Sequence, residues 1–206
     1  IEASRAPLVE HLIELRSRLI RSMIAFVLAF CVTYYFSEEI YQFLTQPLAE
    51  ALGDDPSRRL IYTALQETFF TYIKVAMFGA LCLAFPIIAG QLWMFIAPGL
   101  YRDERMAFLP FLLATPLLFL LGASLVFFFI MPMATEFFLS FESAGGDGAL
   151  PIQLETRVSE YLSLVMTLIF AFGLAFQLPV LLMLMGRAGL VSSAALVKQR
   201  KYAIVA

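Results

Sequence analysis

Four long stretches of the sequence contain no charged side chain. They cover residues 22–37, 75–101, 106–135 and 161–186. A helix needs about 20 mostly apolar residues, each rising about 1.5 Å, to cross the hydrocarbon core of a bilayer. The last three stretches have that length, and the first reaches it when Leu19 and the interface-seeking side chain of Arg21 are included. The sequence therefore predicts an all-α, polytopic membrane protein with four spans.

The composition supports a protein embedded in a lipid bilayer and excludes other classes. The chain is 61% hydrophobic and only 15% charged, unlike a soluble domain. Its net charge of −2 argues against nucleic-acid binding. One histidine and two cysteines leave too few ligands for a His/Cys metal site, and we expect no cofactor. Cys31 and Cys82 lie in apolar runs, where we expect buried, inert thiols.

We expect one transmembrane domain over residues 1–206. The expected spans lie at about 19–37, 69–98, 106–134 and 159–186, the expected outer loops at about 38–68 and 135–158, and a fifth span begins at about 202. Because the chain starts at Ile1 rather than at a methionine, we interpret it as a processed or trimmed piece.

The distribution of basic residues predicts the orientation. All but four of the 14 lysines and arginines precede span one, join spans two and three, or follow span four. The four exceptions are Arg58, Arg59, Lys74 and Arg157. Since cytoplasmic segments collect lysine and arginine, the N-terminus is predicted to be cytoplasmic.

The first outer loop carries signals for further helices. Ser37, followed by two glutamates, is expected to cap a helix that lies along the membrane surface. Pro47 is expected to interrupt this helix, and the turn residues from Gly53 onward to end it. Thr63-Ala-Leu-Gln66 has the form of a capping box, so the second span is expected to start outside the membrane.

Proline recurs in the predicted spans. Each one removes a backbone hydrogen bond and is a candidate kink or helix end. We therefore expect kinked helices that form a concave cup rather than a closed bundle. The six prolines are Pro86, Pro98, Pro110, Pro116, Pro132 and Pro179.

Two acidic residues lie on the side that otherwise collects cations. Glu14 stands four residues before Arg18, and Glu104 lies in a short turn beside Arg105. One interpretation is a helical ion pair and a solvated turn charge. The other is that the two carboxylates receive guanidinium groups, which carboxylates bind in a bidentate fork.

Gln177 is a primary amide at depth in the fourth predicted span. A primary amide in hydrocarbon is costly unless it is paired, so it is expected to face protein or water. It either forms a structural hydrogen bond to a neighbouring helix or is a docking point for another transmembrane helix.

At these positions the sequence resembles the TatC family, the core receptor of the twin-arginine protein translocase. The resemblance extends from about Pro7 to the end of the chain. It rests on His11-Leu-Ile-Glu-Leu-Arg16, Pro47-Leu48, Gln91-Leu-Trp-Met-Phe-Ile-Ala-Pro-Gly-Leu-Tyr101 with Glu104-Arg105, Tyr161-Leu-Ser-Leu-Val-Met166, and Phe172-Gly-Leu-Ala-Phe-Gln-Leu-Pro179.

The resemblance implies a six-span, cup-shaped protein of the bacterial inner membrane with both termini cytoplasmic. Such a protein binds the paired arginines of signal peptides on folded cargo, recruits single-span subunits of the TatA and TatB type, and self-associates in a multi-copy complex. The implied signal-peptide residues are Glu14, Glu104, Phe95, Arg105 and Arg18, and the implied partner-docking residues are Gln177 and Pro47. Many relatives carry glutamate at the position of Gln177, so a role based on charge is not expected here.

Two other functions stay open from the residues. No Asp, Glu, Lys or Arg lies in the central part of a span, which counts against an ion-coupled small-solute transporter unless a missing C-terminal part supplies the coupling residues. The chain could also be a purely structural membrane subunit. We expect no enzyme: the single histidine precedes span one, and there is no Gly-x-Ser-x-Gly sequence.

Overall fold

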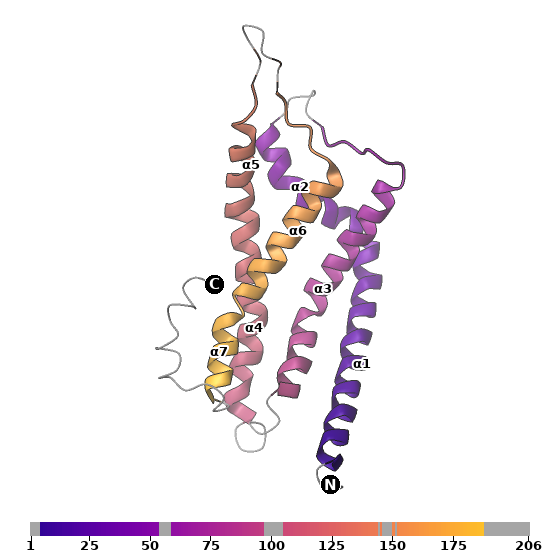
Figure 1. Cartoon of the computed structure of the whole chain (residues 1–206), viewed down its shortest axis with the longest axis vertical. Helices are drawn as coiled ribbons and strands as arrows, with labels where there is room; N and C mark the ends of the chain where they lie inside the picture. Colours follow the sequence, from indigo (N-terminus) through magenta and orange to yellow (C-terminus); the bar gives the residue numbers. More distant parts are fainter. Residues whose placement is uncertain are drawn as a thin grey trace.

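The structure, a computed structural model, is helical throughout the part of the chain that it describes (Figure 1). It describes residues 5–53, 59–96, 105–143, 145, 150 and 152–187. The elements are α1 (Arg5–Tyr35), α2 (Ser37–Leu52), α3 (Glu67–Ile96), α4 (Arg105–Leu125), the π-helical segment η1 (Val126–Ile130), α5 (Met131–Leu139), α6 (Val158–Ala175) and α7 (Leu178–Arg187). Within these residues, strand-like pairing is confined to two isolated bridges. The predicted all-α class is confirmed.

Several of the helices have the length and apolar character of membrane spans. Three helical stretches qualify, at Glu67–Phe95, Leu112–Leu139 and Val158–Met183. The pair α1 and α2 qualifies when taken together, and its two helices are bent by 75° at Phe36. The polytopic class predicted from the uncharged stretches is therefore confirmed, while the fifth span expected from about 202 lies outside the described residues.

The helices form two groups joined at one end of the molecule (Figure 1). α1 and α3 run side by side, and α4, η1 and α5 form one continuous rod against which α6 and α7 pack. α2 lies across the end where the groups meet and contacts α3, α5 and α6. We call α2, with the parts of α5 and α6 that contact it, the cap.

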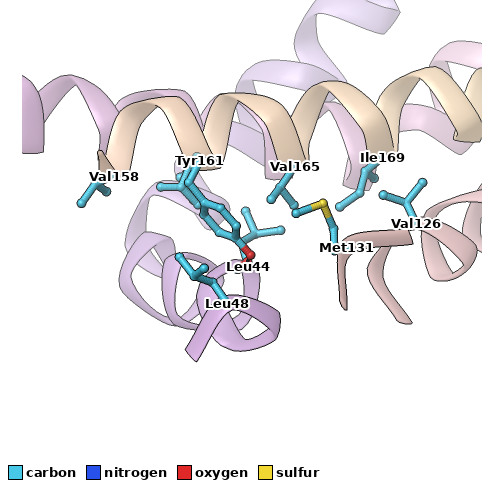
Figure 2. Close-up of a cluster of buried hydrophobic side chains, with 10 residues drawn as sticks. Leu44, Leu48, Val126, Met131, Val158, Tyr161, Val165 and Ile169 are labelled. Carbon is cyan, nitrogen blue, oxygen red and sulfur yellow. Dashed lines mark hydrogen bonds between the residues drawn. The ribbon is translucent and has the colours of Figure 1, made fainter. Parts of the chain in front are cut away.

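The largest buried cluster holds the cap together (Figure 2). Leu44 and Leu48 of α2 pack against Val126 and Met131 of the rod and against one face of α6. The Tyr161 hydroxyl of α6 donates a hydrogen bond to the Leu44 carbonyl oxygen over 3.3 Å. The apolar stripe of α2 therefore faces protein, and buried packing rather than lipid contact fixes this helix.

Two predictions about α2 are wrong. Ser37 does not cap it, because Phe36 occupies the N-cap position without a side-chain bond and the backbone continues from α1, with the Ile40 N–H donating to the Phe36 carbonyl. Pro47 does not interrupt it, because the helix runs on to Leu52. Pro47 is buried beside Leu48, and this packing holds the helix where the backbone hydrogen bond is missing.

The predicted capping box before α3 is wrong by one residue. Glu67, rather than Gln66, accepts hydrogen bonds from the N–H and hydroxyl of Thr63, at 2.8 and 3.1 Å, and from the Ala64 N–H. The same buried carboxylate accepts a 2.5 Å hydrogen bond from the Ser159 hydroxyl. Nη2 of Arg157 lies 3.7 Å from its Oε2. Glu67 therefore ties the start of α3 to the start of α6.

A proline accompanies a helix break at one of the expected places and a change of helix type at another. The break between α6 and α7 precedes Pro179, whereas η1 passes into α5 just before Pro132 without breaking the rod. Pro86, Pro110 and Pro116 lie inside helices that continue through them, and Pro98 lies outside the described residues. A groove of about 570 Å³ and a cavity of about 370 Å³, which share Leu81 and Phe170, lie between α3 and α6–α7.

α4 and α6 cross where two glycines meet the opposite helix. A Cβ atom on Gly122 would lie 2.7 Å from the Phe172 carbonyl oxygen, and one on Gly173 would lie 2.5 Å from the Phe119 ring. Small residues at such crossings let two membrane helices approach closely.

The expectation of buried cysteines is wrong for Cys31, which is exposed on α1, whereas Cys82 is partly covered.

Candidate functional site

The end of the molecule opposite the cap brings the start of α1 to the end of α3 (Figure 1). The His11 ring stacks on the Phe95 ring with their centroids 4.3 Å apart and their planes 16° from parallel. This contact joins the first and third motif blocks of the sequence, which are about 80 residues apart. Because His11 stands three residues before Glu14 on α1, the contact places the Phe95 ring about one helical turn from Glu14.

Glu14 forms the predicted ion pair within α1. Oε1 of its carboxylate accepts from Nη2 of Arg18 at 2.5 Å and from Nε at 3.0 Å. The glutamate side chain is 37% exposed and the arginine side chain 19%. Among the described residues no group donates to Oε2 of Glu14, so half of the carboxylate is open to a further donor.

The second predicted acid cannot be placed beside the first. Glu104 lies outside the described residues, and so does the side chain of Arg105, whose backbone begins α4. The convergence of Glu14 and Glu104 therefore stays a prediction. Phe95, Glu14 and Arg18 are the predicted signal-peptide residues that the structure brings to one place.

Gln177 lies at the break between α6 and α7, where its amide bridges to α4. Its Nε2 donates a hydrogen bond to the Thr115 carbonyl oxygen over 2.8 Å. Its Oε1 is buried without a hydrogen-bond partner. The side chain also lines the cavity of about 370 Å³ between α3, α6 and α7, together with Trp93 and Phe170. The expected structural hydrogen bond is present, and an acceptor remains beside an apolar cavity.

Pro47 is far from both places. It is buried within α2 in the cap, next to Leu48. The predicted residues therefore fall into three separate regions: the Glu14 end, the cavity beside Gln177, and the cap. No group of three or more potential metal ligands occurs in the part of the chain that the structure describes.

Sequence reasoning gave no role to three residues of these regions. His11 lies in a motif block, but no spacing rule predicts its ring contact with Phe95. Thr115 supplies a backbone acceptor, which carries no sequence signal. Ser159 binds Glu67 from 92 residues away. The sequence signal for the capping role of Glu67 is its position directly after the expected capping box, Thr63-Ala-Leu-Gln66.

Comparison with known proteins gives one consistent result. The family model described as Sec-independent protein translocase protein (TatC) matches residues 10–206. The Sec-independent protein translocase protein TatC of Magnetococcus marinus is 54% identical over 201 residues, 98% of this chain and 71% of that protein. The protein of the same description from Rickettsia prowazekii is 48% identical over 95% of this chain and 77% of its own length. A crystal structure described as twin arginine translocase receptor TatC in DDM is 37% identical and matches with a TM-score of 0.78, covering 95% of this chain and 84% of that one.

Proposed function

This chain belongs to the TatC family of Sec-independent protein translocase proteins, and we propose that within the translocase it is the receptor for twin-arginine signal peptides. As a member of this family it is a membrane component of the twin-arginine translocase and supports protein translocation. The family is one of translocase components and not a family of catalytic enzymes. The receptor role, its residues and its partners are the parts that we propose.

The observation that carries the proposal is the half-open carboxylate of Glu14. Arg18 bonds the carboxylate through Oε1 alone in this part-buried pair, so it holds Glu14 in place and leaves Oε2 available. A charge-assisted hydrogen bond to an incoming guanidinium is worth ~1.5–3 kcal/mol. Arg18 therefore orients Glu14, and the arginine of the signal peptide takes the open oxygen.

The stacked rings beside Glu14 favour arginine over lysine. A guanidinium is planar and can stack on an aromatic face while it forms a fork with a carboxylate, whereas an ammonium group is a point charge. Phe95, held by His11, offers such a face one turn from Glu14. We include Glu104 and Arg105 in the receptor site on their sequence positions, with Glu104 receiving the second arginine.

We further propose that the N-terminus and the Glu14 end face the cytoplasm, in the inner membrane of a bacterium. The distribution of lysine and arginine supports this orientation. The two relatives named above are bacterial proteins. The cap then lies on the outer side of the membrane, so Pro47 acts there and not in the capture of signal peptides.

Capture of two otherwise identical signal peptides tests the receptor role. We expect photo-crosslinking to a peptide with two arginines to exceed crosslinking to one with two lysines by about 100-fold or more at low peptide concentration, since each of the two lost forks removes one charge-assisted bond of ~1.5–3 kcal/mol. The measurement is crosslink yield against peptide concentration for the chain in membranes. Equal yields for the two peptides would contradict the proposal.

We also propose that Gln177 docks single-span subunits of the TatA and TatB type, and that copies of the chain assemble in one complex. The free acceptor Oε1 and the apolar cavity beside it support a docking role, because a helix with a hydrogen-bond donor would satisfy a buried, unpaired oxygen.

Replacing Gln177 with leucine is expected to weaken photo-crosslinks to single-span subunits several-fold and to leave capture of signal peptides unchanged. Gln91→Leu is the matched control, because Gln91 also has a buried, unpaired Oε1 in a membrane helix but does not line this cavity. Normal crosslink yield in Gln177→Leu, or an equal loss in Gln91→Leu, would show that Gln177 has only its structural bond to Thr115.

A further inference from the structure

The face between α3 and α6 carries a groove that the proposed receptor site does not use. The groove has a volume of about 570 Å³. Its polar lining consists of Lys74 on α3 and of Ser163 and Thr167 on α6. Its apolar lining includes Leu81, Phe170 and Ala171, and Leu81 and Phe170 also line the cavity beside Gln177. The polar part of the groove therefore adjoins an apolar lining that it shares with the cavity beside Gln177.

The polar groups of this groove have no partner within the described part of the chain. Among the described residues, the side chains of Lys74, Ser163 and Thr167 form no hydrogen bond or ion pair. Glu67, two helical turns before Lys74 on α3, is already occupied by Thr63, Ala64 and Ser159, with Arg157 beside it. The ammonium group is exposed and is available to an external anion.

The position of Lys74 on α3 places it near the edge of the hydrocarbon core when the middle of this membrane-spanning helix lies at the bilayer midplane. Lys74 then stands about 11 Å from the midplane along the helix axis, at about 1.5 Å per residue. Half of the hydrocarbon core is about 15 Å thick, so the long side chain reaches the headgroup level of the leaflet on the Glu67 side. The phosphate groups of anionic lipids lie at this level and attract a cationic side chain.

We propose that this groove binds one anionic phospholipid from that leaflet. Lys74 pairs with the phosphate, Ser163 and Thr167 donate hydrogen bonds to phosphate and ester oxygens, and one acyl chain lies along Leu81 and Phe170 toward the Gln177 cavity. Charge complementarity and the order of polar and apolar lining identify the occupant. The lipid would fill the open space between α3 and α6 on the concave side.

Native mass spectrometry of the detergent-purified chain, titrated with phosphatidylglycerol or phosphatidylcholine, tests this site. We expect tighter binding of phosphatidylglycerol, and an approximately fivefold loss of that preference in Lys74→Gln, from the attraction of one cation to an anionic headgroup. Lys74→Arg should keep the preference. Arg59→Gln is the matched control, because it removes an exposed charge on the same side of the molecule but outside the groove.

A second variant tests the acyl path. Ala171 is exposed in the groove wall, so Ala171→Phe should fill the groove and weaken the binding of both lipids equally. An unchanged preference in Lys74→Gln, an equal loss in Arg59→Gln, or undiminished binding in Ala171→Phe would overturn the proposal. It would also be overturned if a carbodiimide coupled Lys74 in native membranes to a carboxylate of another polypeptide, because the occupant would then be a protein.

Discussion

Glu14→Gln is expected to lower the affinity for a signal peptide with two arginines by about 10- to 100-fold. The variant keeps the size of the side chain and removes the charge, so the guanidinium loses a charge-assisted bond of ~1.5–3 kcal/mol. Fluorescence anisotropy of a labelled signal peptide, titrated with the chain in detergent or nanodiscs, measures this loss directly. Glu39→Gln, which neutralises an exposed glutamate on α2 in the cap, should have no effect.

A double variant separates direct capture from loss of the helical ion pair. In Glu14→Gln alone, Arg18 is left unpaired and repels an incoming arginine. The double variant Glu14→Gln with Arg18→Gln removes that repulsion. If Glu14 receives the peptide arginine, affinity stays low in the double variant. Recovery to the unmodified level would show instead that Glu14 only neutralises Arg18.

Gly122→Ala is expected to destabilise the helical core by ~3 kcal/mol, at the upper end of overpacking effects. The added Cβ would lie 2.7 Å from the Phe172 carbonyl oxygen and 3.1 Å from the Gly173 Cα. Both are backbone atoms, so no side-chain rotation relieves the contact and α4 must move away from α6. Thermal unfolding in detergent, followed by circular dichroism, measures the change.

Gly90 provides a matched control for this crossing. It is also buried in a membrane helix, but a Cβ atom there would meet only the end of the flexible Leu112 side chain, at 3.2 Å. Gly90→Ala should therefore cost less than ~1 kcal/mol, because a leucine methyl group can shift by a few tenths of an ångström. Equal losses in the two variants would contradict the close backbone approach as the cause.

The sequence predicts the positions of helices well where a single local pattern, such as a long uncharged stretch, determines where a helix forms. The uncharged stretches locate the membrane helices, because charged side chains are excluded from hydrocarbon over a fixed length. Local signals fail where tertiary contacts compete with them. Ser37 has the composition of a cap but continues the turn from α1, and Pro47 stays helical because the cap buries it. Gln66 loses its expected role to Glu67, which Ser159 also binds.

The candidate site shows the same division. The pair of Glu14 and Arg18 follows from a spacing of four residues on one helix. The stacking of His11 on Phe95 joins two helices distant in sequence, and no spacing rule predicts it. The bond from Gln177 ends on a backbone carbonyl, which every residue possesses. Its partner could therefore be found only in the folded chain.

The bond between Ser159 and Glu67 sets an order of events during biosynthesis. The two residues are 92 positions apart, and a ribosome adding about 5–20 residues per second needs roughly 5–20 s to make that stretch. Throughout this interval Glu67 has its local partners Thr63 and Ala64 but lacks the Ser159 hydroxyl, and α2 has no α6 to lie against. Closure of the cap is thus a late step of maturation, and a nascent chain arrested before Ser159 would carry α2 without the helix that covers it.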